Sequence, residues 1–92
     1  MKKSSVSREY AVLGETLRQV REKAGVTQVE LATRLKQTQS YVSKLERGAV
    51  RVDFVQVRRI SLALGATFTT IVREFERNLA EPGGAARIRR ES

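Results

Sequence analysis

The stretch Thr27 to Gly48, TQVELATRLKQTQSYVSKLERG, predicts two short helices joined by a very tight turn. Thr27 and Glu30 stand in the S/T-x-x-E relation of a capping box, in which the threonine hydroxyl accepts from the Glu30 amide and the glutamate carboxylate accepts from the Thr27 amide. Thr38 is a good N-cap for the second helix, and the glycine at the end of the stretch stops it. The expected helices are Gln28 to Leu35 and Gln39 to Arg47.

The two helices should bury four apolar positions and leave a polar outer face on the second helix. Isolated helices under about a dozen residues are marginal in water, so these two must share a core. The inward positions are Leu31, Leu35, Val42 and Leu45. The outward positions of the second helix are Gln39, Ser40, Ser43 and Lys44, with no acidic residue among them. Such side chains can hydrogen-bond base edges, and a helix fits the DNA major groove, although the residues alone leave a solvated face as an equal alternative.

The order and spacing of these residues resemble a known family. TQVELATRL followed by QSYVSKLERG is similar to the helix-turn-helix of the Cro/C1, or XRE, repressor class, and LRQVREKAG before it and ISLALG after it continue the likeness. The resemblance covers roughly Leu13 to Val72. It implies an all-α, compact five-helix domain of the lambda-repressor-like type, in which the helix beginning at Gln39 is the recognition helix.

The turn between the two helices departs from the family pattern. The family usually has glycine and then an apolar residue where this chain has Lys36 and Gln37. A non-glycine residue in a left-handed conformation costs on the order of 1 kcal/mol. We therefore expect a slightly strained or rearranged turn.

The resemblance also implies a role for each matching position. It assigns base contacts to Gln39, Ser40, Ser43 and Lys44, and phosphate contacts to Gln28, Arg47 and Arg51. It places Arg21, on the flank of the first helix, against Glu46 as a structural ion pair, and a fork-shaped guanidinium suits a partly buried carboxylate. The residues alone leave this pair open, because charges on helix surfaces are usually independent.

The composition favours double-stranded nucleic acid as the partner of one small domain. The 92 residues include 18 Lys and Arg against 10 Asp and Glu, a net charge of +8. A cationic surface without a partner is the alternative, but an excess this large on a small domain favours a polyanion. Only 5% of the residues are aromatic and none is Trp, so the chain has no stacking platform for single strands.

Several classes of function are excluded by the residues that the sequence lacks. Cysteine and histidine are absent, which excludes disulfides, zinc fingers and histidine- or cysteine-based catalysis. Glu9, Glu15 and Glu22 are spaced along one helix and do not converge, so we expect no enzyme, no cofactor and no metal site. The stretch MKKSSVSREY has no apolar region of the kind found in leader peptides, and no apolar run approaches about 18 residues, so we expect a cytoplasmic protein with no membrane partner.

Three more helices are expected around the helix-turn-helix. The first runs from about Ser7 to Ala24, and glycine stops it. Asp53 and Gln56 form a second capping box, and Thr67 is a further N-cap. These caps predict a fourth helix at Phe54 to Leu64 and a fifth at Phe68 to Leu79. The expected inner face of the fourth helix is Phe54, Val57, Ile60, Ser61 and Leu64.

The chain is accordingly divided into three parts. Residues 1–6 are expected to be a flexible basic arm, which either follows the phosphate backbone or is simply a frayed terminus. Residues 7–80 form the DNA-binding domain, with the helix-turn-helix motif at 28–47 and the fifth helix at 68–79. Residues 81–92 contain Pro-Gly-Gly and little to bury, so we expect a disordered basic tail.

The leading interpretation is a sequence-specific transcriptional regulator, a repressor that binds a pseudo-palindromic operator as a homodimer. The alternative is an antitoxin-like module that binds a protein partner and also represses its own operon. Phe75 and Leu79 are expected to extend beyond the core, and Val55 and Leu62 form an outward stripe on the fourth helix. These four residues are the expected dimer interface, although scattered exposed aliphatic residues are normal in monomers.

Overall fold

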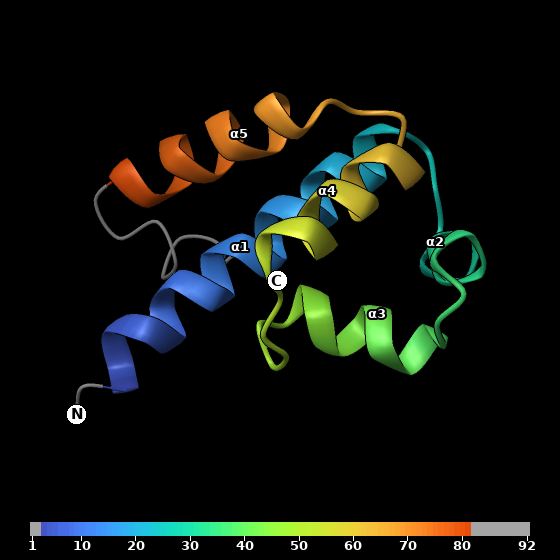
Figure 1. Ribbon diagram of the computed structural model, residues 1–92. Coiled ribbons are helices and arrows are strands. Elements are labelled where there is room, and N and C mark those ends of the chain that lie inside the picture. Colours follow the sequence, from blue (N-terminus) through green and yellow to red (C-terminus); the bar gives the residue numbers. More distant parts are fainter. Residues whose placement is uncertain (1–2, 82–92) are drawn as a thin grey trace.

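The computed structural model describes residues 3–81, with side-chain surroundings from Arg8 onward, and this part of the chain folds as five helices without strands (Figure 1). They are α1 (Lys3–Lys23), α2 (Gln28–Leu35), α3 (Gln39–Glu46), α4 (Phe54–Ala63) and α5 (Phe68–Ala80). The expected all-α, five-helix class is therefore confirmed. In Figure 1, α1 lies between α5 and α3, and it packs against both.

The start of α1 differs from the sequence prediction. The helix begins at Lys3 and not at Ser7, so residues 3–6 are helical where a flexible arm was expected. These residues contain neither glycine nor proline, so nothing in them interrupts a helix. The next turn of α1 is bound to α5, because the Arg8 guanidinium Nη2 donates to the Leu79 carbonyl at 3.3 Å. Residues 1–2 of the expected arm and 82–92 of the expected tail lie outside the described residues.

Threonine side chains begin three of the helices, as the sequence predicts. Thr27 forms the full capping box, with its hydroxyl accepting from the Glu30 amide at 3.0 Å and its amide donating to the Glu30 carboxylate at 2.8 Å. That backbone hydrogen bond holds the pKa of Glu30 below its ordinary value. Thr38 and Thr67 each accept from the amide three residues later.

Only half of the second expected capping box is present. The Asp53 carboxylate accepts from the Gln56 amide at 2.8 Å. The Gln56 side chain does not return to Asp53, because its amide nitrogen donates to the Tyr41 hydroxyl at 3.0 Å. The Gln56 side chain therefore connects α4 to α3 instead of closing its own helix terminus.

Each of the five helices contributes at least one apolar side chain to the centre of the core. These side chains are at most 1% exposed, and they are Leu17, Leu31, Val42, Ile60 and Ile71, with Val12 of α1 fully buried as well. Complete burial of one such side chain is worth about 1.5 to 3 kcal/mol, which a helix of eight residues cannot obtain alone. The two short helices α2 and α3 are therefore held by the other three.

The inner face of α4 is shorter than predicted. Ile60, Ser61 and Leu64 are buried, but Phe54 is 72% exposed. Phe54 is the first residue of α4 and lies beyond the edge of the core, where its ring contacts Phe68 edge-on with centroids 4.6 Å apart. The prediction that Phe54 points inward was wrong.

The buried face of α5 is rotated from the predicted stripe. Val72, expected to cover the core, is 41% exposed, whereas Asn78 is only 3% exposed. The Asn78 amide donates to the Thr16 hydroxyl of α1 at 2.8 Å, so this polar residue faces the longer α1. Phe75 and Leu79, expected to extend beyond the core, are half-buried for the same reason. No helix within the described residues is both long and apolar enough to span a membrane.

Candidate nucleic-acid interface

The turn between α2 and α3 sets the angle at which α3 is presented. Lys36 has φ 59° and ψ 43°, so the turn is strained by a left-handed residue, which was one of the two alternatives that the sequence left open. Lys36 is the only non-glycine residue with positive φ between residues 3 and 81. The Gln37 amide donates to the Ala32 carbonyl at 2.9 Å, which closes the end of α2. A left-handed non-glycine residue costs about 1 kcal/mol. The backbone hydrogen bonds of Lys36 and Gln37 to α2, together with the core that α2 and α3 share, stabilise this conformation.

The C-terminal end of α3 is pressed against α1. A Cβ atom at Gly14 of α1 would lie 2.6 Å from the carbonyl oxygens of both Leu45 and Glu46. Gly48, with φ 76°, is equally confined, because its Cβ would lie 2.8 Å from backbone atoms of Tyr10 and Ala11. Gly14 was not among the predicted site residues, although a lone glycine inside a helical pattern is a signal of close backbone approach.

The outer face of α3 has the residues that the sequence placed there. Gln39, Ser40 and Lys44 are exposed, while Ser43 is half-buried. The Ser43 hydroxyl accepts from the Arg47 guanidinium at 2.5 Å, so a residue expected to read bases is tied to one expected to hold phosphate. The face has no acidic side chain, and the glutamate of α3, Glu46, is buried behind it.

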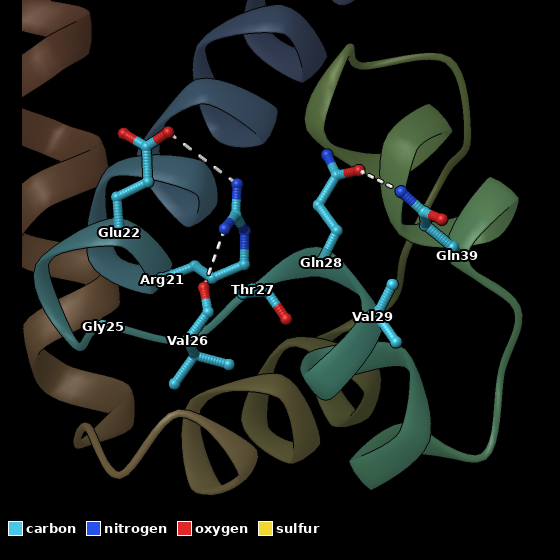
Figure 2. A pocket seen from close by; sticks show the side chains of 8 residues that line it. All are labelled: Arg21, Glu22, Gly25, Val26, Thr27, Gln28, Val29 and Gln39. Atoms are coloured by element: carbon cyan, nitrogen blue, oxygen red, sulfur yellow. Dashed lines mark hydrogen bonds and ion pairs between the residues drawn. The ribbon is translucent and has the colours of Figure 1, made fainter.

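Arg21 and Glu46 form a buried ion pair, as the family resemblance implied. The Arg21 Nε lies 2.6 Å from Glu46 Oε2, and its Nη2 lies 3.0 Å from Oε1. Arg21 is 8% and Glu46 6% exposed. The remaining terminal nitrogen of Arg21 donates to the Val26 carbonyl at 2.8 Å (Figure 2). The hydrogen bond to Glu46 raises the pKa of Arg21 above its ordinary value.

The ion pair continues into the outer face through two glutamines. The Gln28 side-chain nitrogen donates to Glu46 Oε1 at 3.0 Å. The Gln28 oxygen accepts from the Gln39 side-chain nitrogen at 3.3 Å, and Figure 2 shows the two amides pointing toward each other across the start of α2 and α3. Residue types and spacing alone did not predict this connection, because it joins four residues from three helices.

An open hollow of about 430 Å³ lies beside these glutamines. Figure 2 shows its lining, which comes from the end of α1, the connection to α2, the first two residues of α2 and the first residue of α3. The lining residues are Arg21, Glu22, Gly25, Val26, Thr27, Gln28, Val29 and Gln39. The hollow therefore borders Gln28, the residue expected to hold a phosphate at this end of α3.

The other expected phosphate contacts lie at the opposite end of α3. Arg47 is the C-cap of the helix and is exposed. Arg51, also exposed, follows in the loop to α4, and its guanidinium lies 5.7 Å from the centre of the Tyr10 ring. A helix of eight residues is about 12 Å long, so Gln28 and these two arginines lie on either side of the polar face of α3.

Comparison with known proteins agrees with this geometry. A family model described as a helix-turn-helix domain matches residues 12–71. The crystal structure of the clp gene regulator ClgR from Corynebacterium glutamicum is 32% identical, with a TM-score of 0.75 over 80% of this chain and 96% of that chain. A second crystal structure of ClgR is 33% identical, with a TM-score of 0.74 over 78% of this chain and 77% of the other.

A third similar structure comes from another bacterium. An XRE-family-like protein from Pseudomonas syringae pv. tomato is 32% identical to this chain, with a TM-score of 0.70. The match covers 83% of this chain and 93% of that protein. No curated protein sequence matches the chain.

Proposed function

The chain belongs to the XRE-type helix-turn-helix regulators of transcription, and from this premise we propose that it binds one operator sequence in double-stranded DNA as a homodimer and represses transcription there. The observation that carries the proposal is the outer face of α3. It presents an amide, two hydroxyls and an ammonium on a helix that α1 and α2 hold rigidly. A helix held in this way can enter the major groove as a unit.

Each side chain of that face suits a particular contact. Glutamine pairs with adenine through N6 and N7, lysine donates to guanine, and serine can bond to either base, so Gln39, Ser40, Ser43 and Lys44 are the proposed base readers. Gln28, Arg47 and Arg51 are the proposed phosphate contacts. Phosphate contacts fix the register of the protein on the duplex, and base contacts select the sequence.

Selection of bound sequences from a pool of random duplex DNA tests the proposal directly. We expect a pseudo-palindrome whose half-sites are centred about 34 Å apart, one turn of DNA. Gln39→Ala should then relax the preference at one base pair in each half-site. Recovery of a random pool from the wild-type protein would refute sequence-specific binding.

The homodimer is proposed through the outward side of α4. Val55 is 63% and Leu62 is 60% exposed, and the two lie two turns apart on one face of the helix. Phe75 and Leu79 belonged to the interface expected from the sequence, but they are half-buried within one chain and offer it less surface. The exposed Arg59 lies between these two residues, so a dimer formed through this face would bring two Arg59 charges close together. Salt screens that repulsion, and we therefore expect the dimer to become more stable as the salt concentration rises.

Analytical ultracentrifugation of Leu62→Glu tests this interface. Because Leu62 is mostly exposed, the variant should fold normally and sediment as a monomer, while the wild type sediments as a dimer. Val29→Glu is the matched control, since Val29 is 55% exposed but lies on α2 beside Gln39. A Leu62→Glu variant that remained dimeric would exclude the outward side of α4 as the interface.

A protein-binding module of the antitoxin type is the second candidate. The exposed Phe54 at the start of α4 favours it, because a phenylalanine that is 72% exposed beside Val55 forms an apolar contact surface for another protein. The repressor requires a homodimer and a palindromic DNA site, whereas the protein-binding module requires neither. A monomeric wild-type protein that selects no palindrome would favour the module over the dimeric repressor.

A further inference from the structure

We infer that Glu46 is a positioning residue for base recognition: from its buried place behind α3 it determines which way the side-chain amide of Gln39 faces. The inference rests on the proposed function, since it concerns the base that Gln39 reads. It assigns to the buried ion pair a role beyond holding α1 and α3 together. The observation that carries it is the continuous set of hydrogen bonds from Arg21 through Glu46 and Gln28 to Gln39.

The direction of these hydrogen bonds is decided at the Glu46 carboxylate, which can only accept. A carboxylate has no donor, and Arg21 occupies both oxygens of Glu46, at 2.6 and 3.0 Å. A glutamine side chain, by contrast, has a donor end and an acceptor end that differ by a flip of the amide. Gln28 must therefore direct its nitrogen toward Glu46, as it does at 3.0 Å, because the opposite orientation would place its oxygen against the carboxylate.

The orientation of Gln28 then determines the orientation of Gln39. With its nitrogen bound to Glu46, Gln28 presents its oxygen to Gln39 and accepts from the Gln39 nitrogen at 3.3 Å. A flipped Gln39 would bring two amide oxygens together and lose this bond. The polarity of the buried carboxylate is thereby transmitted to a residue that is exposed on the outer face of α3.

What remains free on Gln39 matches one base. One of its two N–H groups is bound to Gln28, which leaves a second N–H and the oxygen free for a base. Adenine needs that pair, because its N7 accepts and its N6 amino group donates, whereas guanine presents two acceptors there. A Gln39 that is free to flip loses this preorganised polarity, and its preference for adenine should weaken.

The inferred role differs from a purely structural one in a measurable way. If Glu46 only stabilises the fold, its loss weakens binding to all sequences equally. If it positions the amide of Gln39, its loss lowers the discrimination at the base pair that Gln39 reads and leaves the other base pairs unaffected. A bidentate base contact discriminates by about 5- to 150-fold, so the difference is large enough to measure.

The test compares dissociation constants of intact dimers for operators that differ only at that base pair, at one salt concentration. The base pair is first identified with Gln39→Ala. We expect Glu46→Gln and Gln28→Met each to reduce adenine discrimination there at least threefold, with preferences elsewhere unchanged. Ile60→Val, a core substitution that leaves the hydrogen bonds intact, controls for lost stability and should retain the discrimination of the wild type.

If Glu46→Gln does not fold, Gln28→Met still tests the inference. Gln28 is only half-buried and is not part of the Arg21–Glu46 ion pair, so this variant should fold. Unchanged discrimination in Gln28→Met would overturn the inference, even if binding to every operator were weaker. Failure of the proposed function gives a different result, because a wild-type protein without sequence preference, or one in which Gln39→Ala alters no base pair, removes the assignment of Gln39 itself.

Discussion

Replacing Gly14 by alanine should push α3 away from α1, although it adds only one methyl group. A Cβ atom at this position would lie 2.6 Å from the carbonyl oxygens of Leu45 and Glu46 and 2.8 Å from the Glu46 carbonyl carbon. All three are backbone atoms at the end of α3, so no side chain can rotate out of the way. One helix must shift relative to the other, and α3 is the helix proposed to read DNA.

The size of the effect follows from these distances. Ordinary contact begins near 3.4 Å, so the two helices must separate locally by about 0.8 Å. Inserting a methylene into a packed site costs about 1 to 3 kcal/mol, and a clash with backbone belongs at the upper end. Alanine regains about 1 kcal/mol of helix propensity over glycine. The expected net loss is about 2 kcal/mol, which lowers the melting temperature of a domain this size by about 8 to 16 °C.

Alanine variants of two other glycines distinguish the cost of the steric clash from the cost of a left-handed backbone conformation. Gly25 has φ 74° but nothing within 4 Å of its Cβ position, so Gly25→Ala should cost only the left-handed conformation, about 1 kcal/mol. Gly48 combines φ 76° with contacts at 2.8 Å, so Gly48→Ala should cost the most of the three. Circular dichroism melts would rank the variants, and operator binding well below the melting temperature would report the displacement of α3.

Two results would contradict this reasoning. A Gly14→Ala protein that melts at or above the temperature of Gly25→Ala would show that the close approach of α1 to the end of α3 is absent. Wild-type operator affinity in a destabilised Gly14→Ala protein would show that the shift does not reach the recognition face. The reasoning requires both lower stability and weaker binding.

Three further predictions concern charged groups. Alanine at Arg21 or at Glu46 should each lower the free energy of unfolding by about 3 to 5 kcal/mol, and the double variant by less than the sum; additive denaturation data would contradict the pairing. Arg51→Ala should weaken binding to all sequences and flatten the slope of log affinity against log salt by about one. Alanine at the exposed Arg73 of α5, which α1 separates from α3, should leave the slope unchanged. Burial raises the pKa of Glu15, so its stabilising contribution is present in acid and is lost as pH rises through that pKa; the lowered pKa of Glu30 gives the opposite sign. Relative to wild type, melts across the carboxylate range should therefore show Glu15→Gln gaining stability and Glu30→Gln losing it as pH rises.

Local chemistry was sufficient to predict most of the helices. The caps at Thr27, Thr38 and Thr67 are present, because a cap joins a side chain to an amide only three residues away. The outer face of α3 also followed from the sequence, since helical periodicity separates the buried Val42 and Leu45 from the polar positions. Contact of that face with DNA stays a prediction.

Tertiary structure decided the features that depend on distant residues. The sequence pattern could not show that Asn78 is buried and Phe54 exposed, because the Asn78 partner, Thr16, is 62 residues away and Phe54 lies beyond the last layer of the core. The close approach at Gly14 likewise exists only because α3 packs against it, which the sequence pattern does not show.

The hydrogen bonds around Gln28 depend on tertiary structure in the same way. The sequence supplied the chemical groups, and the family resemblance paired Arg21 with Glu46. Only the packing of α1, α2 and α3 places the Gln28 amide between Glu46 and Gln39, at 3.0 and 3.3 Å. An amide has no preferred direction on its own, so its direction is decided where the fold puts an acceptor beside one end of it.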